Sequence, residues 1–165
     1  MRQTIYEGRI LSLYIDDGKW EYVKHAPAVV ILAIQDGKML AVKQKRRAAG
    51  VDTIEAPAGL VDEGEDPIVA AARELGEEAR LAADFTLLGR FYTSPGFTDE
   101  LIHLYRADNL REGSGNRDED EHDMEVIWIE PQCLLDGVQD GSIHTSGPTV
   151  SAALHAILEL GKQQG

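Results

Sequence analysis

One stretch of the chain organises the rest of the sequence, residues 59–81: Gly59-Leu-Val-Asp-Glu-Gly-Glu65-Asp-Pro-Ile-Val-Ala-Ala-Ala-Arg73-Glu74-Leu-Gly-Glu77-Glu78-Ala-Arg80-Leu81. It predicts a loop that leads into a helix. Asp66 is a favoured N-cap residue, and Pro67 suits the first helical position, where its missing N–H costs nothing. Apolar residues recur with helical spacing and predict the face that packs on a core: Ile68, Ala72, Leu75 and Ala79.

Three carboxylates of this helix, Glu74, Glu77 and Glu78, lie three or four positions apart and therefore share nearly one face. Like charges at that spacing oppose helix formation by a few tenths of a kcal/mol per pair, and a divalent cation would turn that repulsion into attraction. Arg73 precedes Glu77 by four residues and can hold that carboxylate. A Glu-rich helix is more often a solvated face, but the number of defined positions at defined spacing favours a metal-binding loop and helix.

The stretch resembles the signature of the Nudix hydrolases, which cleave nucleoside diphosphates linked to another moiety. The signature is Gly, five residues, Glu, seven residues, Arg-Glu-aliphatic-any-Glu-Glu, and its charged positions are all present: Glu65, Arg73, Glu74, Glu77 and Glu78. The resemblance implies that the three helical glutamates hold metal ions and that Arg73 and Glu77 belong to the catalytic machinery. One position departs, because Arg80 stands where the family has the glycine that ends the helix in a left-handed conformation.

Length and composition limit the function classes. At 165 residues and 43% apolar content the chain fits one domain, residues 1–165. No apolar run is long enough to cross a membrane, and the first residues lack an apolar leader, so we expect a cytoplasmic protein without a membrane partner. A net charge of −13 disfavours nucleic acid. The single cysteine, Cys133, excludes an internal disulfide and is expected to be buried.

The remaining elements predict an α/β fold with a mixed sheet. We expect strands at Leu11–Ile15, Trp20–Tyr22, Ala28–Ile34, Met39–Val42, Thr86–Tyr92, Leu101–Ala107 and Glu125–Ile129, and helices at Pro131–Leu135 and Pro148–Leu160, the last stopped by Gly161. With helices over both faces this is the α/β/α sandwich of the Nudix fold. Residues 1–25 resemble the small N-terminal sheet through which one branch of the family forms homodimers; the alternative is an added edge of the main sheet.

Features outside the helix resemble the ADP-ribose pyrophosphatase branch of that family. A Ser-Pro-Gly turn on its own is only a turn, but here Pro95 follows Leu81 by 14 residues, close to the separation of about fifteen in that branch. The resemblance implies that Gly96, Phe97 and Glu100 bind substrate. It also implies that Arg46 contacts a phosphate, with Arg47 as a competing choice. Trp20 is a candidate platform for the nucleotide base, from the same chain or from a partner subunit, with packing of its own hairpin as the alternative.

The same resemblance predicts the cofactor and the reaction. The carbonyl of Ala58 would join the three glutamates, and an all-oxygen ligand set suits two or three Mg²⁺ ions, or Mn²⁺. Glu119 and Glu121 lie in an acidic loop whose counterpart carries the general base. The implied substrate is ADP-ribose or a related nucleoside diphosphate sugar, cleaved to AMP and a sugar phosphate. Two alternatives stay open: a module that senses ADP-ribose without cleaving it, and a pyrophosphohydrolase of nucleoside triphosphates.

Overall fold

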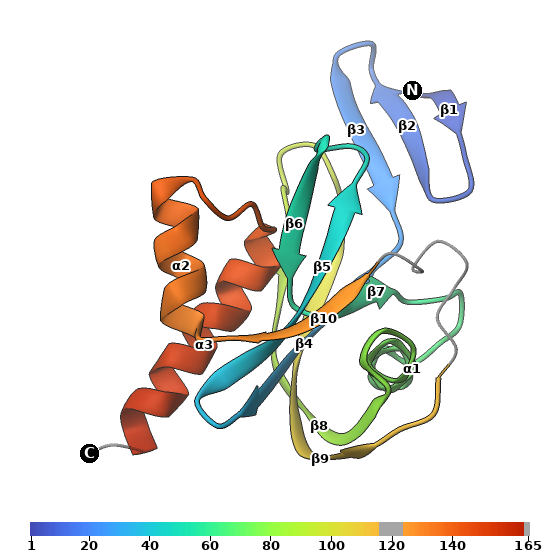
Figure 1. Cartoon of the computed structure of the whole chain (residues 1–165). Helices are drawn as coiled ribbons and strands as arrows, with labels where there is room; N and C mark the ends of the chain where they lie inside the picture. The colour runs from blue at the N-terminus through green and yellow to red at the C-terminus, as the bar shows by residue number, and fades with distance from the viewer. Residues whose placement is uncertain (116–123, 164–165) are drawn as a thin grey trace.

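The structure is a computed structural model, and it describes residues 1–115 and 124–163 (Figure 1). Its elements follow the chain as β1 (Arg2–Glu7), β2 (Leu11–Asp16), β3 (Trp20–His25), β4 (Ala28–Gln35), β5 (Lys38–Arg46), β6 (Val51–Glu55), β7 (Ala58–Leu60), α1 (Pro67–Ala79), β8 (Leu81–Tyr92), β9 (Leu101–Glu112), β10 (Glu125–Ile129), α2 (Pro131–Asp140) and α3 (Gly147–Gln163). Among the described residues, no helix combines the length and apolarity needed to span a membrane.

The larger sheet forms the middle layer of the predicted sandwich. Its order is β10-β5-β4-β9-β8, with β6 paired to β5 and β7 paired to β4. The sheet is mixed, because β4 runs parallel to β9 whereas β8 and β9 are antiparallel. In Figure 1, α1 covers one face of this sheet and α2 with α3 cover the other. The predicted α/β class is confirmed.

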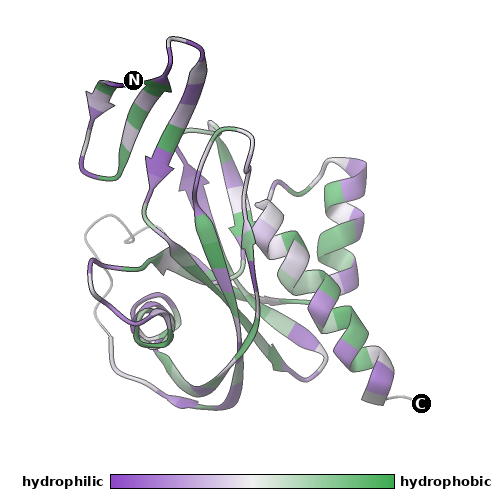
Figure 2. Ribbon diagram, turned by 180° about the vertical axis from the view of Figure 1, so that it is seen from behind, coloured by the Kyte–Doolittle hydropathy of each residue, from purple (hydrophilic) through white to green (hydrophobic). Residues whose placement is uncertain are grey.

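Strand β4 explains why both faces need a helix. Its side chains alternate, so that Val29 and Ile31 pack with residues of α1, whereas Val30 and Leu32 pack with residues of α2 and α3. These four side chains are at most 2% exposed. Burial of each is worth about 1.5–3 kcal/mol, which makes this strand the centre of the core. Figure 2 shows hydrophobic colouring along the middle of the main sheet, whereas hydrophobic and hydrophilic residues alternate along the N-terminal strands.

The hairpin of β4 and β5 opens away from its turn. The Asp36-Gly37 turn has positive φ at both residues, as a tight hairpin requires, and pairing is confined to Ile34 with Met39 and Gln35 with Lys38. Beyond that point β6 pairs with β5 and β7 pairs with β4. These two short strands were not predicted; β7, with three residues, is too short to show a periodic pattern. The segment that joins them crosses the opening and carries Ala58 towards α1.

Residues 1–25 form a separate three-stranded sheet in the order β1-β2-β3. The alternative of an added edge of the main sheet is therefore wrong for this chain. Strand β3 contacts the β8–β9 connection instead, through an isolated bridge between Val23 and Thr98 and a hydrogen bond from the Val23 N–H to the Phe97 carbonyl oxygen at 2.7 Å. The sheet thus reaches the main body through the turn that contains Pro95.

Several expected details are wrong. Helix α2 continues to Asp140, and α3 passes through Gly161 to Gln163, because glycine near a helix end is unfavourable but does not stop the helix when no turn demands it. Strands β8 and β9 extend past the predicted limits along each other's edge. Cys133 is exposed, since it lies on the outer side of α2 and Leu134 faces the core.

Helix α1 ends in the left-handed conformation that glycine usually adopts, although the residue at this position is Arg80. Its φ of 55° and ψ of 37° are left-handed, and its N–H donates to the Gly76 carbonyl oxygen at 3.0 Å. A left-handed conformation costs a side-chain-bearing residue about 1–2 kcal/mol. The chain after β9 also approaches this end, because a Cβ on Gly115 would lie 2.2 Å from the Gly76 oxygen. Close backbone approach therefore explains the glycine at position 115, and a Cβ on Gly76 would in turn lie 3.1 Å from the Ser114 carbonyl oxygen.

Candidate active site

A cleft of about 870 Å³ lies where α1, the opening of the β4–β5 hairpin and the N-terminal sheet meet. Its walls come from distant parts of the chain. The lining residues are Arg9, Ile10, Gln44, Lys45, Arg46, Arg47, Ala58, Gly59, Leu60, Asp62, Arg73, Glu74, Glu77, Glu78 and Met124. All three predicted helical glutamates, Ala58, Arg73 and Arg46 therefore border one cavity.

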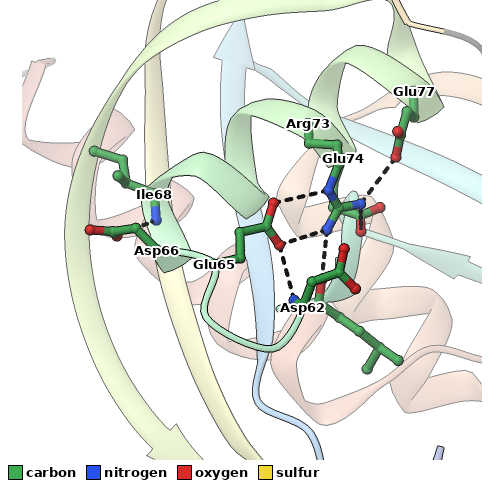
Figure 3. A network of polar contacts seen from close by, with 8 residues as sticks. Asp62, Glu65, Asp66, Ile68, Arg73, Glu74 and Glu77 are labelled. Carbon is green, nitrogen blue, oxygen red and sulfur yellow. Dashed lines mark hydrogen bonds and ion pairs between the residues drawn. The ribbon is translucent and has the colours of Figure 1, made fainter. Parts of the chain in front are cut away.

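Arg73 organises the acidic wall of the cleft (Figure 3). Its Nε and Nη2 donate to the two carboxylate oxygens of Glu65 at 3.1 and 3.0 Å. Its Nη1 donates to Glu74 at 2.6 Å and to Glu77 at 3.2 Å, as the four-residue spacing to Glu77 predicted. A further bond from Nη2 to the Leu60 carbonyl oxygen, at 2.9 Å, fixes the loop that enters α1. One guanidinium thus holds the helix, the loop and two candidate metal ligands together.

This network shifts the ionisation of its members. The hydrogen bonds from Arg73 lower the pKa of Glu65 below its ordinary value of 4.5. In turn the bonds to Glu65, followed by those to Glu74, raise the pKa of Arg73 further above its ordinary value. Glu65 is therefore a charged group at neutral pH, and its charge is directed at Arg73 rather than into the cleft.

Two of the candidate metal ligands are held by the β7 backbone. Glu78 is 2% exposed, and its Oε2 accepts a hydrogen bond from the Ala58 N–H at 3.2 Å. Glu74 is 7% exposed and lies directly over Gly59, where an added Cβ would stand 1.9 Å from its carboxyl carbon. Burial of two carboxylates in a cleft disfavours their charge unless cations or hydrogen bonds compensate. The backbone of Ala58 and Gly59 thus sets where these carboxylates lie.

The opposite wall is basic. Lys45 and Arg46 end β5, Arg47 directly follows it, and Arg9 comes from the β1–β2 turn. Arg46 forms a two-point ion pair with Glu55, with Nε to Oε1 at 2.9 Å and Nη2 to Oε2 at 2.7 Å. Neither Arg9 nor Glu55 was predicted as a site residue. A single residue in a hairpin turn carries no pattern, and the contact of Glu55 with Arg46 depends on the pairing of β6 with β5, so only the folded chain shows these two positions.

Four other predicted site residues do not line this cleft in the single chain. Gly96, Phe97 and Glu100 lie in the β8–β9 connection, where Glu100 accepts a 2.7 Å hydrogen bond from Thr93 Oγ1 and contacts His25 at 3.4 Å. Trp20 begins β3 beside the β2–β3 turn, is 62% exposed, and has Lys19 over its ring at 4.8 Å. Glu119 and Glu121 lie outside the described residues.

The donor atoms present fit a hard divalent cation. The side chains of Glu74, Glu77 and Glu78 offer carboxylate oxygens, Ala58 offers a backbone carbonyl, and no cysteine or histidine lines the cleft among the described residues. Within residues 1–115 and 124–163 no three acidic, histidine or cysteine side chains converge on one point as they stand. Arg73 draws Glu74 and Glu77 towards itself, so their assignment as ligands stays a prediction.

The chain was compared with known proteins. A family model for the NUDIX domain matches residues 24–145. An ADP-ribose pyrophosphatase of Bacillus subtilis (strain 168) is 37% identical over 155 residues, which cover 87% of this chain and 83% of that protein. A methanol dehydrogenase activator of Bacillus methanolicus is 40% identical over 161 residues, which cover 90% of this chain and 86% of that protein.

The fold has a solved counterpart. A crystal structure of an ADP compounds hydrolase aligns with a TM-score of 0.79 and 22% sequence identity, over 100% of this chain and 94% of that one. At that identity the likeness supports the fold alone. The family model and the two sequence relatives show that this chain belongs to the Nudix family, as the pattern of its carboxylate helix predicted.

Proposed function

We propose that the protein hydrolyses the diphosphate bond of ADP-ribose, or of a related nucleoside diphosphate sugar, with Mg²⁺ or Mn²⁺ as cofactor. For ADP-ribose the products are AMP and ribose 5-phosphate. The observation that carries the proposal is the cleft, in which buried carboxylates on α1 face a wall of arginine and lysine side chains. The name of the Bacillus subtilis relative, an ADP-ribose pyrophosphatase, supports the choice of substrate.

The charge distribution suits an anionic ligand that arrives with cations. The acidic wall (Asp62, Glu74, Glu77 and Glu78) would repel a diphosphate by itself, and the whole chain carries a net charge of −13. Two or three divalent ions held by the glutamates and the Ala58 carbonyl would reverse that local field. The basic wall would then contact the phosphate oxygens, with Arg46 as the residue placed to donate to them.

The proposed reaction gives a role to each of these site residues. When bound, the metal ions would polarise the diphosphate and lower the pKa of an attacking water. Arg73 orients Glu74 and Glu77, and the Ala58 N–H orients Glu78. Glu119 or Glu121 would act as the general base that accepts the proton of the attacking water.

The proposal extends to assembly and location. We place the protein in the cytoplasm as a homodimer of single Nudix domains, with residues 1–25 as the dimerisation element. In such a dimer Trp20, Gly96, Phe97 and Glu100 would serve a site that the single chain leaves incomplete. Trp20 in particular would stack on the nucleotide base in the partner's cleft, because its exposed ring lies away from its own cleft.

A substrate panel tests the activity. We expect AMP release from ADP-ribose with Mg²⁺ and none after chelation, at a higher kcat/KM than from NADH, GDP-mannose or other ADP-sugars. Binding of ADP-ribose without AMP release would instead identify a sensing module, which is relevant because one relative is named as an activator of another enzyme. Preferential release of pyrophosphate from nucleoside triphosphates would replace the proposed substrate class.

The metal assignment has its own test in Glu78→Gln. Glutamine keeps an oxygen that can accept from the Ala58 N–H but removes the charge, so the fold should persist. We expect kcat to fall roughly 1,000-fold or more, because metal-ion catalysis supplies several kcal/mol of transition-state stabilisation. The control is Glu63→Gln, an exposed glutamate of the preceding turn, which should leave kcat unchanged. Near-normal turnover of Glu78→Gln, with its melting temperature unchanged, would rule out Glu78 as a metal ligand.

A further inference from the structure

Arg46 lines the cleft outside the signature helix, and it forms an ion pair with Glu55. Glu55 contacts the Nε and Nη2 edge of the guanidinium at 2.9 and 2.7 Å. A guanidinium has five N–H donors, so the edge formed by Nη1 and the second Nη2 hydrogen can still donate to two oxygens. The Arg46 side chain is 45% exposed whereas that of Glu55 is 7% exposed. The arginine thus reaches the open cleft while its partner is buried beneath it.

The backbone around Glu55 is braced by the segment that leads into α3. The Ile54 N–H donates to the His144 carbonyl oxygen at 2.9 Å, and Thr145 Oγ1 donates to the Ile54 carbonyl oxygen at 2.6 Å. On the other side of Glu55, the Ala56 N–H donates to Thr149 Oγ1 at 3.0 Å. Both neighbours of Glu55 are therefore fixed by residues 144–149, which do not themselves line the cleft.

The charge of Glu55 is maintained in this position. Burial by itself would raise the pKa of its carboxyl, but the hydrogen bonds and charge of Arg46 outweigh burial and lower it. The same bonds raise the pKa of Arg46. Arg47 also lines the cleft, but it makes no ion pair with the described residues. Of the two neighbouring arginines, only Arg46 is thus held in one orientation by a buried, ionised partner.

We infer that Glu55 is a positioning residue, which holds the Arg46 guanidinium so that its free edge meets a phosphate of the substrate. This inference rests on the proposed function, since it assigns a role in binding the diphosphate. The expected consequence is kinetic, because a preorganised arginine loses less freedom when the substrate binds. It also resolves the choice between Arg46 and Arg47 in favour of Arg46.

The test combines Glu55→Gln, Arg46→Ala and the double variant, assayed with ADP-ribose at saturating Mg²⁺. We expect Glu55→Gln to raise KM roughly tenfold, the size of one charge-assisted hydrogen bond, with kcat within about twofold of the wild type. Arg46→Ala should raise KM at least as much, and adding Glu55→Gln to it should change KM no further. Arg47→Ala should raise KM less than Arg46→Ala does.

A matched control distinguishes a positioning role of Glu55 from a general effect on the stability of the protein. Glu159→Gln breaks another part-buried pair, that of Arg106 with Glu159 between β9 and α3, on the face of the sheet away from α1. It should lower the melting temperature without changing KM. Additive effects of Glu55→Gln and Arg46→Ala on KM would overturn the inference, as would a fall in kcat that extra Mg²⁺ restores, since that would place Glu55 at the cation site. If the wild type releases no AMP at all, the proposed function fails instead.

Discussion

Gly59 shows how one missing side chain can shape a cleft. Its place in β7 lies under the Glu74 carboxylate, and a Cβ there would overlap the carboxyl group. The φ angle of Gly59 is not positive, so alanine fits the backbone. The overlap falls on the end of a flexible side chain, which can swing away. The glycine is therefore needed for the position of Glu74 rather than for the path of the chain.

We predict that Gly59→Ala folds but loses activity. Displacement of Glu74 by an ångström or more should lower kcat/KM about 100-fold, the typical effect of misplacing a group in an active site by that distance. The measurement is AMP release, with thermal melting to confirm folding. Gly89→Ala is the matched control, because Gly89 lies in strand β8 and its added Cβ meets no atom within 4 Å. Full activity in Gly59→Ala would show that Glu74 is not needed in its present place.

At the scale of elements, α1 is fixed to its entry loop by Glu65 and Arg73. The ion pair spans eight residues and closes the loop onto the first turns of the helix, while Glu65 Oε2 also accepts from the Asp62 N–H at 3.0 Å. The Asp66 side chain caps the helix through the Ile68 N–H at 3.0 Å, as predicted. Loop and helix therefore behave as one unit that presents Glu74, Glu77 and Glu78.

This ion pair predicts a dependence of stability on pH. Because the folded pKa of Glu65 lies below its ordinary value of 4.5, its stabilising contribution is complete above about that pH. The contribution is lost as the pH falls through the folded value. We expect the melting temperature of the metal-free wild type to fall more steeply below about pH 4.5 than that of Glu65→Gln. Glu63→Gln should follow the wild type, whereas identical curves for wild type and Glu65→Gln would contradict the prediction.

At the scale of the whole molecule, the N-terminal sheet is the part that the single chain covers least. Every residue of β1 is exposed, and five apolar side chains of this sheet, Ile5, Tyr6, Ile10, Leu11 and Trp20, are 39–62% exposed. A small sheet needs a covered apolar face to be stable in water. A second copy of the chain would supply that cover in the proposed dimer.

Subunit mixing tests whether Trp20 acts in the partner's cleft. We expect Glu78→Gln and Trp20→Ala each to lower activity as homodimers. Mixed in equal amounts and allowed to exchange, they should recover about a quarter of wild-type activity, because half the dimers are mixed and each mixed dimer has one intact site. Mass spectrometry of differently tagged chains would verify the exchange. Exchange without recovered activity would show that Trp20 serves its own chain or none.

Much of the fold follows from local patterns. The helix with its cap, the doubly buried strand and the Asp-Gly turns were all predictable, because each depends on residues close together in the sequence. The limits of α2, α3, β8 and β9 were not, since neighbouring elements rather than local preference decide where a helix or strand ends. The exposure of Cys133 depends likewise on which side of α2 meets the core.

The candidate site likewise has one part that the sequence predicted and another that it did not. Sequence alone determined the family and the acidic wall. The four charged residues from Arg73 to Glu78 lie on two adjoining turns of one helix, so their spacing in the sequence sets their relative positions in space. Arg46 in the opposite wall was also predicted, from the family resemblance, but only the tertiary structure decided which residues surround it. The ion pair of Arg46 with Glu55 and the approach of Arg9 depend on the pairing of β5 with β6, on the opening of the β4–β5 hairpin and on the hydrogen bond from Ala56 to Thr149 of α3. Such contacts join residues as many as 93 positions apart, and no local pattern records them.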